Sequence, residues 1–238
     1  METLAGKTAI VSGSSSGIGA AIARELSLRG AHVVINYPFK SEQKAAESVL
    51  LSLQGPAKSI IVEADLSTTT GPSKLVDAAT AEFGSIDILV NNAGVVAPFD
   101  LGNQDDAQCL RSWETAINTN GRGTFLLTRA VLRHLSPQNS RIINICSTTF
   151  TRSWARDLPR KYGCTVNAVA PGPVATELAL AAPPQVLETM RATCEATPVA
   201  SRMAEPWEVA WAVATLCENK AGWLNGVYLP VAGGSTLS

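Results

Sequence analysis

The sequence predicts an α/β fold, a doubly wound parallel sheet of about seven strands with helices on both faces. Short runs rich in β-branched residues alternate along the chain with segments of helical periodicity, which is typical of right-handed βαβ units. The 238 residues, 46% of them hydrophobic, are enough to bury the core of one such domain. We therefore expect residues 1–238 to form a single domain.

The expected elements follow one another with short connections. The predicted strands cover residues 8–12, 31–36, 59–63, 87–91, 141–146, 165–170 and 227–231. Helical periodicity covers residues 17–29, 41–53, 73–83, 113–135 and 207–217. Residues 177–197 are rich in Ala and Pro and fall outside this alternation.

The charge balance excludes several kinds of partner. The formal net charge is -1 and 16% of the residues are charged, so no basic face for nucleic acid or an anionic membrane is expected. No leader pattern and no run of 18 apolar residues is present, which favours a cytoplasmic protein with small-molecule partners. The five cysteines are widely spaced among apolar neighbours, and we expect neither a metal site nor a disulfide framework.

A glycine-rich segment, residues 13–19, lies between the first predicted strand and the first predicted helix. At such a turn the backbone can approach a pyrophosphate closely, and the N–H groups of the helix point at the anion. Glycine-rich turns also occur without a ligand, but the placement and the downstream sequence Asn-Asn-Ala-Gly at 91–94 favour dinucleotide binding. The predicted contacts are Gly13, Ser15, Ser16, Gly17, Ile18 and Gly19.

The whole set of motifs resembles the short-chain dehydrogenase/reductase family, in particular its fungal ketoreductases. The set comprises the glycine segment, Asp65-Leu66, residues 91–94, Ser147 after an apolar strand, and residues 171–176. The resemblance runs from about Leu4 to Gly234 and implies a Rossmann-like sheet, with residues 177–197 as a mobile lid over the substrate. It adds cofactor contacts from Asp65, Leu66, Asn92, Ala93, Gly94, Val174 and Thr176. As a residue alone, Asp65 could equally cap the following turn.

The end of the second strand indicates the kind of dinucleotide. A carboxylate there would bind the ribose diol and repel a 2′-phosphate, but residues 36–41 contain no acid and one lysine. NADP(H) is therefore favoured over NAD(H), with Tyr37, Lys40 and Ser41 as candidate contacts. The alternative is that Lys40 belongs to a solvated loop.

The resemblance also implies the chemistry, which is transfer of a hydride between the nicotinamide and a carbonyl or alcohol compound. A family member uses a serine to polarise the carbonyl, an asparagine to hold a proton-relay water, and a tyrosine with a lysine four residues later to pass the proton. Ser147 matches the serine, and Asn120 the asparagine, with Asn118 in reserve.

The expected tyrosine and lysine are missing. Arg160 and Cys164 stand where the family pattern would place them, and none of the three tyrosines precedes a lysine by four residues. About 20 residues are absent by comparison with that pattern, with the junction near residues 149–151. Tyr162 directly precedes the sixth strand, so we place it at the edge of the sheet opposite the cofactor.

The shortened crossover has structural consequences. We expect Pro159 to end a helix over residues 151–158, which would leave part of one sheet face exposed. In the family this helix also contributes to a dimer interface, so the homo-oligomer that the resemblance implies is in doubt.

Three hypotheses follow from the sequence. The chain is a slow NADP-dependent reductase, a cofactor-binding pseudoenzyme, or the product of a mis-spliced transcript or wrongly assigned exons of an active reductase gene.

Overall fold

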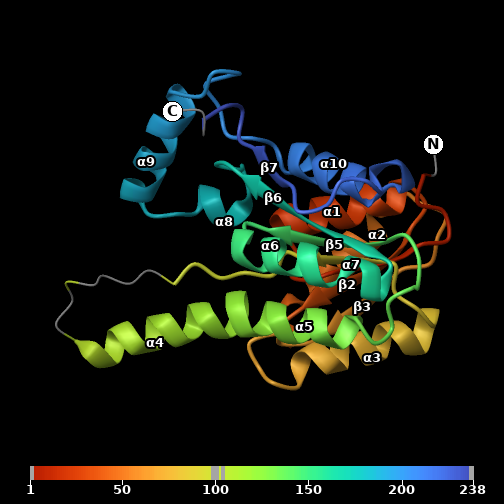
Figure 1. The fold of residues 1–238 in the computed structure, drawn as a ribbon. Helices are drawn as coiled ribbons and strands as arrows, with labels where there is room; N and C mark the ends of the chain where they lie inside the picture. Colours follow the sequence, from red (N-terminus) through yellow and green to blue (C-terminus); the bar gives the residue numbers. More distant parts are fainter. Residues whose placement is uncertain (1–2, 98–101, 103–104, 236–238) are drawn as a thin grey trace.

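The computed structural model describes residues 3–97, 102 and 105–235. Its strands form one sheet in the order β3-β2-β1-β4-β5-β6-β7, and every neighbouring pair is parallel (Figure 1). The strand order reverses direction between β1 and β4, where an open α/β sheet binds its ligands. The predicted doubly wound, Rossmann-like parallel sheet is confirmed.

The element bounds agree with most of the sequence predictions to within a few residues. The strands are β1 Thr8–Val11, β2 His32–Tyr37, β3 Ile60–Glu63, β4 Ile88–Asn91, β5 Ser140–Ile145, β6 Cys164–Pro171 and β7 Tyr228–Val231. The helices are α1 Gly17–Leu28, η1 Lys40–Glu42, α2 Gln43–Leu51, α3 Gly71–Phe83, α4 Asp106–Ala116, η2 Ile117–Gly123, α5 Thr124–Val131, α6 Thr148–Asp157, α7 Pro159–Tyr162, α8 Glu177–Leu180, α9 Pro184–Glu195, α10 Pro206–Cys217 and η3 Asn219–Ala221.

Each face of the sheet is covered by its own layer of helices (Figure 1). On one face α1, α2 and α10 pack on the sheet, with Ile22 and Val213 fully buried against strand residues such as Val33. On the other face α3, α5 and α6 contribute Leu75, Leu127 and Ala155 to a second core. Successive residues of a strand point to opposite faces, which is why both cores draw on the same strands.

The long helix predicted over residues 113–135 is wrong at both ends. It begins earlier, at Asp106, because the Asp105 carboxylate caps it by accepting a hydrogen bond from the Gln108 N–H at 3.0 Å. Residues Ile117–Gly123 then have π-helical geometry, and α5 ends at Val131. An interruption of this kind is frequent at functional sites.

The segment between β5 and β6 also differs from the expectation. Pro159 ends α6 as predicted, but α6 already begins at Thr148, and Pro159 opens the short helix α7. The predicted exposure of the sheet is wrong, because every residue of β5 except Ile145 and every residue of β6 except Pro171 is buried. Trp154, Leu158 and Tyr162 pack on this core and, with α6 and α7, supply the cover.

A buried chain of hydrogen bonds fastens α6 to the sheet. Asn91 Nδ2 donates to Asn144 Oδ1 at 2.8 Å, and Asn144 Nδ2 donates to Thr151 Oγ1 at 2.9 Å. The Thr151 hydroxyl in turn donates to the Ser147 carbonyl at 2.5 Å. Thr151 therefore satisfies a buried amide and fixes the first turn of α6 at the end of β5.

Replacing Thr151 by Val should destabilise the protein by about 1–3 kcal/mol, because it leaves the buried Asn144 amide without its acceptor. Urea unfolding measures the effect, and Thr149→Val is the matched control, since Thr149 lies on the same helix but is exposed. Equal unfolding free energies for the two variants would show that the buried hydrogen bonds do not hold α6.

Candidate cofactor site

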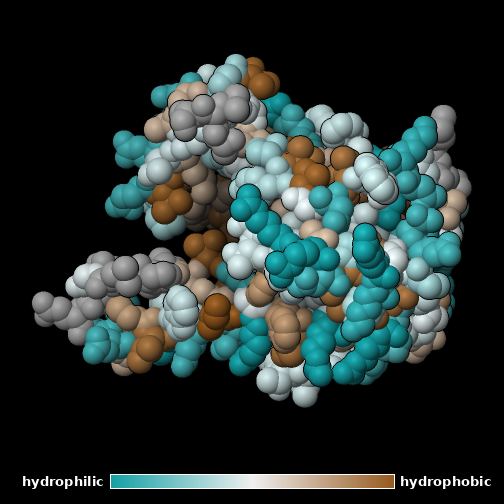
Figure 2. Space-filling model, in the orientation of Figure 1, coloured by the Kyte–Doolittle hydropathy of each residue, from teal (hydrophilic) through white to brown (hydrophobic). Residues whose placement is uncertain are grey.

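A cleft of about 860 Å³ opens at the carboxyl edge of the sheet, where the loops after β1 to β4 meet. In Figure 2 the surface is hollowed on this side, between α4 and the α8–α9 segment. Residues from β1, β2, β3 and β4 loops form the inner wall, while α4, η2 and α8 form the rim.

The glycine loop forms the floor of the cleft and leads into the N-terminus of α1. Gly13 and Gly17 have φ of +59° and +56°, a conformation that favours glycine. A Cβ on Gly13 would lie 2.8 Å from the Ala93 Cα, and a Cβ on Gly19 would overlap the Gly13 carbonyl oxygen. Glycine at these two positions therefore lets the loop pack directly against the segment after β4 and against its own next turn. The N-terminus of α1 faces the cleft beside this closely packed loop, which suits a pyrophosphate.

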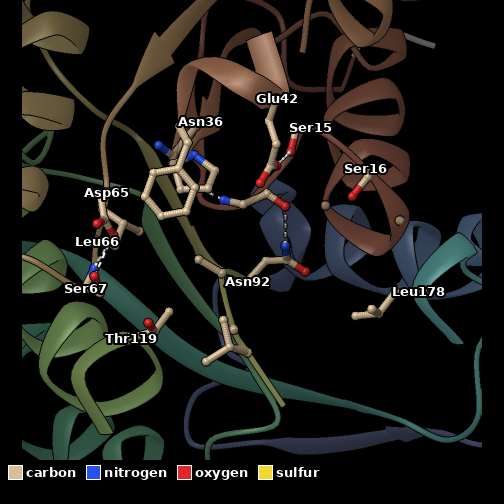
Figure 3. Close-up of a pocket in the computed structure, with 18 of the residues that line it drawn as sticks. Ser15, Ser16, Asn36, Glu42, Asp65, Leu66, Ser67, Asn92, Thr119 and Leu178 are labelled. Carbon is tan, nitrogen blue, oxygen red and sulfur yellow. Dashed lines mark hydrogen bonds between the residues drawn. The ribbon is translucent and has the colours of Figure 1, made fainter. Parts of the chain in front are cut away.

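The loops after β1 and β4 are joined by hydrogen bonds through Ser12 and Asn92. Ser12 Oγ accepts from the N–H groups of Asn92 and Ala93 at 3.0 and 2.9 Å. Asn92 Nδ2 donates to the Ser12 carbonyl at 2.9 Å and to the Gly13 carbonyl at 3.0 Å, and Figure 3 shows the second of these bonds. This arrangement sets the width of the cleft between the two loops.

The structure brings most of the predicted cofactor residues to the cleft. Those that line it are Gly13, Ser15, Ser16, Gly17, Ile18, Gly19, Asp65, Leu66, Asn92, Ala93, Gly94 and Thr176. Four do not line it. Tyr37 and Val174 are buried in the core, and Lys40 and Ser41 lie exposed on η1.

Tyr37 is unsuited to contact a cofactor through its hydroxyl. Its side chain is 5% exposed and packs in the core under α1 and α2. Burial, with added repulsion from Glu63 and Glu47, raises the pKa of the phenol. The aromatic ring was predicted at the cofactor because of its position at the strand end, but the alternation of the strand turns it to the core.

The sequence analysis missed a carboxylate at this corner. Glu42, the last residue of η1, points back to the glycine loop, and its Oε2 accepts a hydrogen bond from Ser15 Oγ at 2.7 Å (Figure 3). The predicted cofactor corner, residues 36–41, ends one residue before Glu42. Other lining residues that were not predicted are Asn36, Pro38, Phe39, Ala64, Ser67, Val95, Arg111, Glu114, Thr115, Thr119, Glu177 and Leu178.

Asp65 lies at the cleft and also caps the turn after β3. Its Oδ1 accepts from the Ser67 N–H at 2.9 Å and from Ser67 Oγ at 2.7 Å (Figure 3). The alternative interpretation of Asp65 as a turn cap is therefore confirmed, while a contact with the adenine stays a prediction.

The two predicted catalytic residues are not part of the cleft wall. Ser147 follows β5 at the carboxyl edge and is the N-cap residue of α6, directly after Cys146, which has φ of +61°. Asn120 lies in η2, and its side chain both accepts from the Val95 N–H and donates to the Val95 carbonyl, each at 2.9 Å. Asn120 thus holds the loop after β4, and the reserve residue Asn118 is the one that lines the cleft.

Tyr162 lies at the opposite edge of the sheet from the cleft. It ends α7, one residue before Gly163, and β6 begins at Cys164. The eight residues of β6 span roughly 25 Å at ~3.3 Å per residue. None of the described residues that line the cleft is a tyrosine or a lysine.

Metal-binding clusters and membrane-spanning helices are both absent from the described part of the chain. No group of three or more His, Cys, Asp or Glu side chains could hold a metal ion there. None of the described helices is long and apolar enough to cross a membrane.

The chain is similar to many known short-chain dehydrogenases and reductases. The family profile described as short chain dehydrogenase matches residues 7–155, and one described as Enoyl-(Acyl carrier protein) reductase matches residues 148–236. The chain is 36% identical to the short-chain dehydrogenase/reductase FrzI of Cladobotryum sp, over 98% of this chain and 96% of the relative. It is 33% identical to glucose 1-dehydrogenase 2 of Bacillus subtilis (strain 168), over 99% and 97%.

A solved structure has the same fold. It is a short chain dehydrogenase from Burkholderia cenocepacia J2315 in complex with NADP, with a TM-score of 0.87 and 29% identity over 98% of this chain and 99% of that one. The alignment with the Cladobotryum relative extends over 255 positions, more than the 238 residues present here, so it must contain gaps in this chain.

Replacing Gly19 by Ala should abolish dinucleotide binding and lower the thermal stability, because the new methyl group would overlap the Gly13 carbonyl and press on Asn92. Gly222→Ala is the control, since Gly222 lies outside the cleft and its Cβ would come no closer than 3.1 Å to another atom. Fluorescence titration with NADPH and a thermal melt measure both effects. If the two variants bound alike, the close packing of the glycine loop would not be needed for the site.

Proposed function

Because the chain belongs to the short-chain dehydrogenase/reductase family, we propose that it is an NADP(H)-binding oxidoreductase of small carbonyl or alcohol compounds whose proton-transfer machinery is incomplete. The observation that carries the proposal is the cleft in which the closely packed glycine loop, fixed by Asn92, and the N-terminus of α1 form a cradle. This cradle fits the pyrophosphate of a nicotinamide dinucleotide.

The preference for NADP(H) rests on the corner after β2. Asn36 stands at the strand end, where its Oδ1 accepts from the Gly13 N–H at 3.0 Å, so no carboxylate from β2 faces the adenosine ribose. Lys40 lies exposed on η1 beside the cleft wall residue Phe39, within reach of a 2′-phosphate by the length of its side chain. The NADP complex of the Burkholderia structure supports the same cofactor.

Carbonyl reduction requires a hydride donor, a hydrogen-bond donor to the carbonyl oxygen and a proton donor. A bound nicotinamide supplies a hydride to the carbonyl carbon. The Ser147 hydroxyl, at the end of β5, can donate a hydrogen bond to the carbonyl oxygen. The oxygen must then gain a proton, and Tyr162 lies too far away to give it. Loss of a positioned acid typically costs about 100-fold to 10,000-fold in rate.

A second candidate function is a cofactor-binding protein without turnover. It is favoured by the separation of the two halves of the site, since the cleft is lined mainly from the β1 to β4 side while Ser147 stands outside its wall. The gaps in the alignment with relatives favour a third reading, in which exons of an active reductase gene were skipped or wrongly assigned. Sequencing the transcript across the codons for residues 147–154 separates it from the other two.

The chain should bind NADPH more tightly than NADH, and Lys40→Ala should weaken NADPH binding about tenfold while leaving NADH binding unchanged, because only NADPH carries the 2′-phosphate. Fluorescence titration of the bound reduced nicotinamide measures both constants. Lys44→Ala is the control, an exposed lysine of α2 that does not line the cleft. Equal binding of the two cofactors by the unmodified chain would overturn the preference.

Reduction of ketones by the chain should be very slow, and Tyr162→Phe should leave any residual rate unchanged. Inserting a family helix with its Tyr-x-x-x-Lys at the junction near residue 150 should raise the rate by about 100-fold or more. Steady-state oxidation of NADPH with a panel of ketones is the measurement. An ordinary enzymatic rate in the present chain that Tyr162→Phe abolishes would refute the assignment.

A further inference from the structure

The adenosine end of the cleft carries a carboxylate that does not come from the second strand. Glu42 belongs to η1, on the connection to α2, and lines the cleft with Asn36 and Phe39. Its Oε2 accepts a hydrogen bond from Ser15 Oγ at 2.7 Å, so the carboxylate is held over the glycine loop (Figure 3). We propose that Glu42 limits the selectivity of the site for NADPH over NADH.

Glu42 lies on the path that a bound dinucleotide is expected to follow. The pyrophosphate lies at the N-terminus of α1, and the adenosine of a dinucleotide extends from there across the end of β2. Ser15 is in the glycine loop and Asn36 is in β2, and Glu42 faces the space between them. The adenosine ribose of a bound dinucleotide would therefore lie beside the Glu42 carboxylate, which would accept a hydrogen bond from the 2′-hydroxyl.

The charged side chains at this corner have opposite effects on a 2′-phosphate. The ionisable residues that line the described cleft are Glu42, Asp65, Glu114, Glu177 and Arg111, so carboxylates outnumber cations. A 2′-phosphate placed beside Glu42 is repelled by it. Lys40, at the other end of the same 3-10 turn, attracts the phosphate from the solvent side.

The balance of Lys40 and Glu42 on one turn therefore sets the preference. The proposal rests on the proposed dinucleotide binding and adds the residue that tunes it. Gln in place of Glu42 keeps an acceptor for the Ser15 hydroxyl and removes the negative charge alone, so it isolates the electrostatic effect.

The test compares the ratio of the dissociation constants of NADH and NADPH in the full chain and in Glu42→Gln. The ratio should rise about tenfold in the variant, mainly through tighter NADPH binding, as expected for loss of one unit charge about 5 Å from the phosphate in a solvent-screened site. Glu47→Gln is the matched control, because Glu47 lies on α2, hydrogen-bonded to Gln43, and does not line the cleft.

A second variant, Glu42→Ala, removes both the charge and the acceptor and should raise the ratio in the same direction, which keeps the test decisive if one variant folds poorly. An unchanged ratio in both variants, with both cofactors bound by the unmodified chain, overturns the role of Glu42 alone. Binding of neither cofactor by the unmodified chain overturns the proposed function and this inference together.

Discussion

The hydrogen bonds between Ser12 and the start of the loop after β4 are the constraint on which the site depends. They join two loops that are far apart in the sequence, and they do so at the point where the strand order reverses. The Ser12 hydroxyl accepts hydrogen bonds from the N–H groups of Asn92 and Ala93, two partly buried residues that follow the end of β4. This close approach requires glycine at positions 13 and 19, because a Cβ there would overlap the Ala93 backbone and the Gly13 carbonyl oxygen.

The shortened connection between β5 and β6 is stabilised by different means. The Thr151 hydroxyl links Asn144 of β5 to the first turn of α6. This hydrogen bonding fastens the helix to the sheet although the connection is short. Asn225 Nδ2 also donates to the Ala155 carbonyl at 2.7 Å, which ties α6 to the loop before β7. A helix of ten residues can thus cover the sheet when hydrogen bonds fasten it in both halves and Trp154 and Ala155 pack on the core between α6 and the strands.

Sequence reasoning predicted the strands and the glycine loop because both depend on local patterns. The alternation of β-branched runs and the glycine spacing act over a few residues, and both are confirmed by the sheet and the cleft wall. The predictions were wrong or incomplete where a contact that no local pattern encodes determines an element boundary or a side-chain position. The cap from Asp105 moved the start of α4, and the reach of Glu42 to Ser15 depends on how η1 folds back. No periodicity in the sequence encodes either contact.

The residues proposed for cofactor binding and those proposed for chemistry belong mainly to separate strands and their connections. The cradle is built from β1 to β4, whereas Ser147 and the segment expected to carry the tyrosine belong to the connection between β5 and β6. The two groups meet at the carboxyl edge, and the hydrogen bonds that shape the glycine loop are made among residues of β1, β2 and β4 and the loops after them. A change confined to the later connection therefore leaves the hydrogen bonds of Ser12, Asn36 and Asn92 intact. For this reason the proposed cofactor binding and the proposed loss of turnover are separable hypotheses, and a measurement of one does not substitute for a measurement of the other.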